Sequence, residues 1–187
     1  MLIDPSSPPQ ITTSSVPTGT LSVLYNQPLQ AAAGIGPLTW SISAGSLPPG
    51  LTFGPPSTGP RVIISGTPTT QGTFNFTVTV TDTVRQVDTR ALSITISLPA
   101  PPTITTTTLP AGSIGQTYNQ PVMATGTGPL TWSISVGALP PGLNLNATTG
   151  TITGAPTATG TFPFTVRVAD TFGQNDTQPS SILVSTQ

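Results

Sequence analysis

The sequence contains no cysteine, histidine, lysine or glutamate, so four arginines and five aspartates are the only charged side chains among its 187 residues. Without histidine there is no Ser-His-Asp triad and no imidazole ligand for a metal. The absence of cysteine excludes thiol nucleophiles, and the absence of lysine excludes Schiff-base chemistry and Lys–Asn isopeptide bonds. We therefore expect a protein that is not an enzyme.

Charge is also too sparse to attract a charged partner. The net charge is −1 and no basic cluster occurs, so nothing in the chain matches the charge of phosphate backbones or anionic membrane surfaces. No apolar run approaches the roughly 20 residues of a spanning helix. The first residues lack the basic and apolar regions of a secretory signal. We expect no nucleic-acid partner, no membrane insertion and no signal peptide in this chain.

The sequence does contain an internal repeat. The stretch PLTWSISAGSLPPGL at 37–51 returns as PLTWSISVGALPPGL at 129–143, and each copy holds one of the two tryptophans. Each copy of the repeat is about 90 residues long, which is enough to bury a core of its own. We therefore expect two domains, residues 1–100 and 101–187, joined by a short proline-rich linker at 98–103.

Apolar residues alternate with Ser and Thr along several stretches, which is the period of a half-buried strand. Leu92, Ile94 and Ile96, for example, alternate with Ser93 and Thr95. Short β-branched stretches between Gly/Pro turns predict an all-β fold of two tandem antiparallel β-sandwich domains. In the first copy we expect seven strands, near 10–14, 20–25, 27–33, 37–44, 61–65, 73–82 and 90–98.

The two tryptophans could be a ligand platform, because an exposed Trp can stack on a sugar. Trp40, however, falls in phase with Leu38 and Ile42, and residues two apart share one face of a strand. A buried Trp on this strand is known from immunoglobulin-like sandwiches. We therefore interpret both tryptophans as core residues, together with four phenylalanines. The expected core residues are Trp40, Trp132, Phe74, Phe76, Phe162 and Phe164.

One polar constellation occurs in both copies, as DTVRQVDT at 82–89 and DTFGQNDT at 170–177. Carboxylates at a strand end can supply ligands to Ca²⁺, which takes six to eight oxygens. Two carboxylates are few for this cation, and Asp and Thr side chains also close turns by hydrogen bonds to the backbone. Turn closure is the favoured interpretation, and calcium, the only cofactor considered, is the alternative. The candidate calcium ligands are Asp82, Asp88, Asp170 and Asp176.

The longest repeated blocks carry a family resemblance. They read ISGTPTTQGTFNFTVTVTD at 64–82 and ITGAPTATGTFPFTVRVAD at 152–170, and they follow the shared W-S-I-S-x-G-x-L-P-P-G-L stretch. These motifs resemble the immunoglobulin-like repeats of bacterial surface proteins, which are akin to dystroglycan-type cadherin-like domains. The resemblance implies a β-sandwich that usually occurs in tandem and is usually non-enzymatic. An insertion within 54–61 alters the TG-x-I-x-G turn of that family.

This resemblance favours a structural or adhesive module. We expect a spacer or surface interaction element within a larger assembly, displayed on the exterior of a bacterial cell or a virus particle. A phage virion decoration protein of the capsid or tail is the first alternative. A carbohydrate-binding module is the second, although Phe53 and Phe172 are the only aromatics expected in its loops.

The expected partners follow from the sheet edges and the loops. Sheet edges usually carry Lys or other charges that block pairing, and a net charge near zero promotes association. We therefore expect protein subunits of a larger assembly to cover edge strands such as QITTSS at 10–15. Glycans are the second expected class of partner. The loops at 35–36 and 54–61, where the copies differ, are the expected places for functions particular to one copy.

Overall fold

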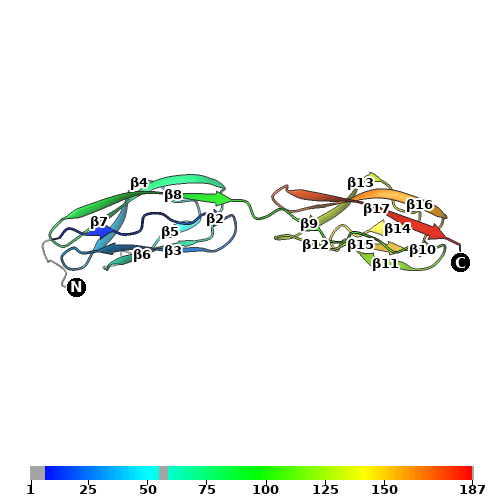
Figure 1. The fold of residues 1–187 in the computed structure, drawn as a ribbon, viewed down its shortest axis with the longest axis horizontal. Coiled ribbons are helices and arrows are strands. Elements are labelled where there is room, and N and C mark those ends of the chain that lie inside the picture. The colour runs from blue at the N-terminus through cyan, green and yellow to red at the C-terminus, as the bar shows by residue number, and fades with distance from the viewer. Residues whose placement is uncertain (1–6, 55–58, 187) are drawn as a thin grey trace. The chain divides into compact units, whose positions relative to one another are not determined.

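The computed structural model describes residues 7–54 and 59–186, and this part of the chain contains strands but no helix, hence none that could span a membrane. It divides into two compact units, Met1–Pro99 (unit 1) and Ala100–Gln187 (unit 2). In each unit two layers of strands enclose a hydrophobic core (Figure 1). The fold is all-β, with two tandem immunoglobulin-like sandwiches and a proline-rich linker between them.

Unit 1 consists of two four-stranded sheets. All paired strands are antiparallel except β2 and β8, which run parallel. Between β1 and β2 the chain passes from one sheet to the other, and we call residues 12–18 the crossover. The first sheet has the order β1 (Gln10–Ile11), β3 (Tyr25–Ala32), β6 (Arg61–Gly66), β5 (Leu51–Phe53). The second has the order β2 (Gly19–Thr20), β8 (Val87–Ser97), β7 (Gly72–Thr81), β4 (Thr39–Gly45).

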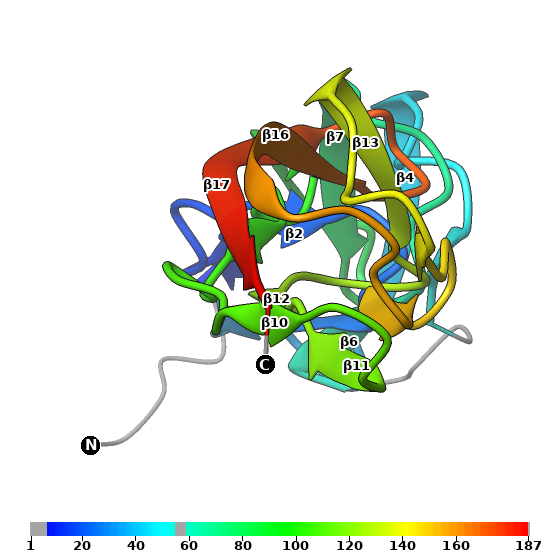
Figure 2. The ribbon, with the colours of Figure 1, turned by 90° about the vertical axis from the view of Figure 1, so that its right-hand side faces the viewer.

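Unit 2 repeats this arrangement, but its first layer is divided into two sheets. Strands β13 and β16 lie on one side of the sandwich and β11 on the other (Figure 2). The divided layer has the orders β11 (Tyr118–Pro121), β15 (Thr151–Gly154), β14 (Leu143–Leu145) and β12 (Ala124–Thr125), β9 (Thr103–Ile104). The other layer has the order β10 (Gly112–Ser113), β17 (Asn175–Ser185), β16 (Gly160–Ala169), β13 (Thr131–Gly137).

Alternate residues of the long strands form the core. On β7, Phe76, Val78 and Val80 are buried, whereas the intervening threonines are more exposed. Phe164 repeats the burial of Phe76 in unit 2. Because side chains alternate between the two faces of a strand, a period of two buries one face of each sheet and leaves the other in water.

The strand boundaries differ from the expected ones at the start of unit 1. Residues 20–25 do not form one strand, since a turn separates β2 from β3. Strand β3 instead begins at Tyr25 and runs without a break through Asn26 and Pro28, the second of which the expected strand at 27–33 already contained. The backbone N–H of Gln30 donates to the hydroxyl of Thr13, on the side of β3 where β1 lies. Residues two apart in a strand direct their backbone nitrogens to the same side, so the nitrogen of Pro28 also faces that side. Since β1 pairs only with Ala31 and Ala32, the missing N–H of Pro28 removes no ladder bond.

Two further differences concern short strands. Strand β5 was not expected, and it brings the described strands of unit 1 to eight rather than seven. The expected strand at 10–14 is reduced to Gln10–Ile11, because the crossover then leaves β3 for the other layer. Strands of two or three residues carry too little alternation to be recognised from sequence.

Candidate functional site

Asp82 closes the turn that follows β7. Its side chain is 5% exposed, and its Oδ1 accepts hydrogen bonds from the backbone N–H groups of Val84 at 3.0 Å and Gln86 at 2.8 Å. Its Oδ2 accepts a third bond from Ile35 N–H at 3.1 Å. Thr83 holds the same loop, because its backbone N–H and its hydroxyl both donate to the carbonyl of Ile35. The carboxylate thus fixes the loop around Ile35 to the β7–β8 turn.

Asp170 has the corresponding position in unit 2. Its Oδ1 accepts bonds from Phe172 N–H at 2.9 Å and Gln174 N–H at 2.8 Å, so it closes the same turn. Asp170 is half-buried, whereas Asp82 is buried. The preceding loop is one residue shorter in unit 2.

Asp88 connects the two layers of unit 1. Its Oδ2 accepts a hydrogen bond from Ile11 N–H of β1 at 2.7 Å, although Asp88 itself belongs to β8 of the other sheet. Its Oδ1 accepts from Thr89 N–H at 2.8 Å. Unit 2 repeats the clamp, because Asp176 accepts from Ile104 N–H at 2.8 Å. Hydrogen bonds to a charged acceptor are stronger than those between neutral groups. These bonds therefore stabilise the contact between the two layers, at β1 and β8 in unit 1 and at β9 and β17 in unit 2.

The geometry of the four aspartates favours turn closure over calcium. The two carboxylates of each unit are directed to different segments, Asp82 to the β7–β8 turn and Asp88 to β1. Between residues 7 and 186, leaving out 55–58, no group of three or more His, Cys, Asp or Glu side chains could hold a metal. Backbone N–H groups already supply the positive partial charge that a cation would provide.

The tryptophans lie inside the sandwiches. Trp40 is 4% and Trp132 is 6% exposed, so neither ring offers a face to a sugar. The Nε1–H of Trp40 donates to the carbonyl of Gly59 at 3.0 Å. Phe76 and Phe164 are buried, whereas Phe74 and Phe162 are half-buried and pack against the edge of the core. Phe53, which we expected in a loop, is the last residue of β5 and packs against the core, whereas Phe172 lies in the β16–β17 turn; both are half-buried.

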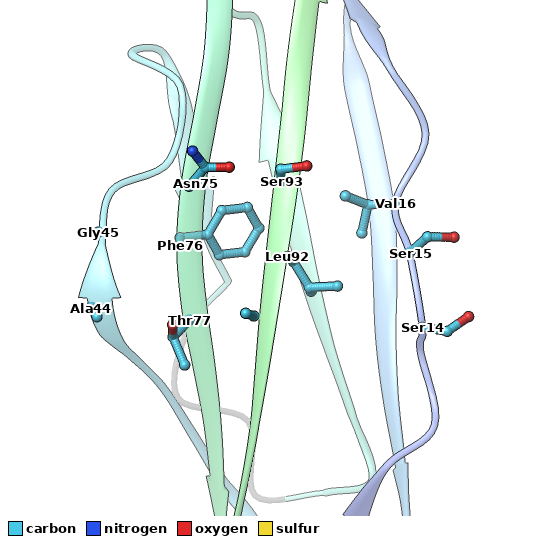
Figure 3. Close-up of a pocket in the computed structure, with 11 residues that line it drawn as sticks. Ser14, Ser15, Val16, Ala44, Gly45, Asn75, Phe76, Thr77, Leu92 and Ser93 are labelled. Carbon is cyan, nitrogen blue, oxygen red and sulfur yellow. The ribbon is translucent and has the colours of Figure 1, made fainter.

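The candidate binding site of unit 1 is a groove of about 640 Å³, which crosses the sheet of β4, β7 and β8 (Figure 3). It is lined by Ala44 and Gly45, residues 75–77, residues 91–93 and residues 14–16 of the crossover. The pairing register Gly45–Phe76–Leu92 places these segments in one row across the strands. We call this feature the transverse groove.

The transverse groove is polar but uncharged. The outward-facing side chains of Asn75, Thr77 and Ser93 supply an amide and two hydroxyls, and no charged residue lines the groove. Ala44 and Ala91 are small enough to leave the row open. The groove can therefore exchange hydrogen bonds in both directions with a ligand but cannot neutralise a charge on it.

The groove was missed in the sequence because its residues have the ordinary pattern of outward-facing positions. A signal is nevertheless present in the repeat. Asn75 stands in a block that is otherwise nearly constant, where unit 2 has Pro163, and Ala91 stands where unit 2 has Pro179. Of the expected functional loops, residues 55–58 lie outside the described part of the chain, and Ile35 is bonded to the β7–β8 turn.

Comparison with protein families places the chain in a class. The family described as "Putative Ig domain" matches residues 8–97 and again residues 101–185. The chain therefore belongs to this family, with one member domain in each unit. Immunoglobulin-like domains of this kind are generally non-enzymatic and typically extracellular. A comparison with curated proteins finds no match to this sequence.

Solved structures give the same fold. The titin domains Z1Z2 in complex with telethonin match with a TM-score of 0.57 at 14% identity, over 97% of this chain and 98% of that one. An endo-fucoidan hydrolase of glycoside hydrolase family 107 matches at 0.42 and 21% identity, over 97% of this chain but 35% of the enzyme. Drosophila N-cadherin EC1-4 matches at 0.40 and 16%, over 98% of this chain and 51% of that one. Of these three, only the titin match exceeds a TM-score of 0.5, and it shows a similarity of fold alone.

Proposed function

We propose that the chain is a non-enzymatic structural and adhesive module on the exterior of a bacterial cell or a virus particle. It serves there as a spacer and surface interaction element within a larger assembly of protein subunits. The observation that carries this proposal is that tandem immunoglobulin-like domains account for nearly the whole chain. The family and the tandem arrangement are typical of extracellular adhesion modules, and the aspartates are used to hold the fold.

The sheet edges support an interaction through faces rather than through strand pairing. Strands β1 and β2 at the sheet edges have two residues each, and β5 has three. The longest edge strand, β4, carries a bulge between Ile42 and Ala44 and ends at Gly45 with φ of 72°. Short strands and bulges block edge pairing without charged residues. We therefore place the contacts with other subunits on the outer faces of the sheets and not, as the sequence led us to expect, at edge strands such as 10–15.

The proposal is tested by locating the chain on its native source. Antibodies raised against the full chain, coupled to gold, are applied to intact cells, to lysed cells and to purified virus particles. Labelling of intact cells indicates a cell-surface module, and labelling of particles indicates a virion decoration protein. Labelling that appears only after lysis, with unlabelled particles, contradicts the proposed location.

A further inference from the structure

We propose that the transverse groove of unit 1 binds a neutral glycan, which gives a ligand class to the adhesive role proposed above and rests on it. The groove spans three strands and the crossover. With adjacent strands about 4.8 Å apart, four side-by-side segments make the groove about 14 Å long. This length, with a volume of about 640 Å³, accommodates a short oligosaccharide.

The lining selects for a ligand without charge. Asn75, Thr77 and Ser93 offer donors and acceptors, whereas the crossover turns Val16 towards β8 and the hydroxyls of Ser14 and Ser15 away from it (Figure 3). A sulfate, phosphate or ammonium group placed here would lose its hydration without gaining a counter-charge. A neutral polyhydroxylated chain exchanges its bonds to water for bonds of the same kind to the amide and hydroxyl groups.

The direction of the groove argues against a peptide. Extended peptides bind β-proteins by adding a strand to a sheet edge, where backbone groups are unpaired. The transverse groove runs across the strands instead, and β7 at its centre is already paired with β4 on one side and β8 on the other. Recognition in this groove therefore depends on side chains, which suits a glycan.

Unit 2 shows the same place without the groove. Val136 and Pro179 stand there in the row where unit 1 has Ala44 and Ala91, and Pro163 stands in the adjacent outward-facing row, where unit 1 has Asn75. The remaining hollow of about 410 Å³ is confined to residues 107–109 and 179–181. The bulkier apolar residues fill these positions, and unit 2 has no side-chain amide where unit 1 has Asn75. We therefore assign glycan binding to unit 1 alone.

The experiment uses the full chain on an array of neutral, sulfated and uronic-acid glycans, followed by NMR titration of labelled protein with the neutral glycan that binds best. We expect only neutral glycans to bind, with shifts concentrated at the amides of Ser15, Asn75 and Ser93. No aromatic side chain is exposed in the groove, so we expect a Kd on the order of 1 mM per site, which several copies on one surface would strengthen.

Two variants test the groove itself. The double variant N75A/S93A removes two hydrogen-bonding groups and should weaken binding roughly tenfold or more. The variant N75P/A91P installs the residues of unit 2, in a register that unit 2 shows to be compatible with the fold, and should abolish binding. The matched control T73A/T95A removes a pair of hydroxyls 3.0 Å apart on the same face but outside the groove, and should bind like the parent.

The proposal is overturned if no neutral glycan shifts these amides, if anionic glycans bind equally well, or if N75A/S93A binds unchanged while its melting temperature matches that of the control. These outcomes are separable from the adhesive role. A silent array together with surface labelling of intact cells or particles removes the glycan but leaves the module and its location in place.

Discussion

The two units carry the same tryptophan strand and cover it differently. In unit 1 the insertion within 54–61 lets β6 begin early, with Val62 in the core, and the indole of Trp40 donates to Gly59. In unit 2 a tight turn precedes β15 and ends at Gly150, which has φ of 70°. A Cβ atom at Gly150 would lie 2.6 Å from the Trp132 ring. Four inserted residues thus change what seals the core.

The turns that Asp82 and Asp170 close also differ between the two units. Asp82 accepts three backbone bonds and fixes a neighbouring loop, whereas Asp170 accepts two and closes only its own turn. The loop that contains Ile35 has one more residue than its counterpart in unit 2. The two units therefore combine loops of different length with the same type of aspartate turn.

The largest effect is expected from removing either tryptophan. The variants Trp40→Ala and Trp132→Ala should each destabilise their own unit by about 3–5 kcal/mol, the usual cost of truncating a buried large aromatic residue. The buried residues form two separate core clusters, so calorimetry of the full chain should show one transition lowered and the other kept. A variant that lowers both transitions equally contradicts this separation.

Next in size is the aspartate comparison. Asp82→Ala leaves three backbone donors without an acceptor and should cost about 3 kcal/mol, whereas Asp170→Ala leaves two and should cost about 2 kcal/mol. Urea denaturation of both variants measures the difference, and Asp82→Asn is the control because it retains one carbonyl oxygen. Addition of millimolar Ca²⁺ should leave the melting temperature of the parent unchanged. A shift of several degrees that Asp82→Ala abolishes would restore the calcium hypothesis.

A smaller effect separates backbone strain from packing at Gly150. Gly150→Ala should destabilise unit 2 by about 2–3 kcal/mol. The new methyl group would overlap the Trp132 ring, and the alanine would have to adopt a left-handed backbone conformation. Gly173→Ala is the matched control, since its φ is 83° but no atom lies within 4 Å of the added Cβ; about 1 kcal/mol is expected for the backbone alone. Equal losses in thermal unfolding would show that Trp132 moves aside.

The smallest effect should be the same in both units. Burial raises the pKa of Tyr25 and of Tyr118, and each hydroxyl donates to a proline carbonyl at 2.9 Å. The pKa of each tyrosine in the folded protein lies above the unfolded value of about 10. The contribution of each tyrosine to the free energy of unfolding is therefore constant below pH 10 and falls as pH rises above it. Tyr25→Phe and Tyr118→Phe should each cost about 1 kcal/mol at pH 7 and flatten the alkaline decline. An unchanged decline in the double variant would assign it to another group.

Periodicity alone was sufficient for the class of fold. Alternation along 73–82 and 90–98 agrees with β7 and β8 to within a few residues, and it assigned Trp40 and Phe76 to the buried face. It was insufficient at the start of β3, where we expected one strand to end at Tyr25 and another to begin at residue 27. Both parts pair with β6 in one continuous register, which only the assembled sheet sets. Periodicity also overestimated Phe74, which lies near the start of β7 and is only half-buried.

The sequence by itself determined the two sandwiches, because burying one face of a strand requires nothing more than a period of two and turns at the right spacing. Only the tertiary structure decided what the polar residues do. Besides their local partners, Asp82 accepts a bond from Ile35, 47 residues away, and Asp88 accepts one from Ile11, 77 residues away. The transverse groove depends on the register of three strands, which brings Gly45, Phe76 and Leu92 into one row. Register is a property of the assembled sheet, and no single strand contains it.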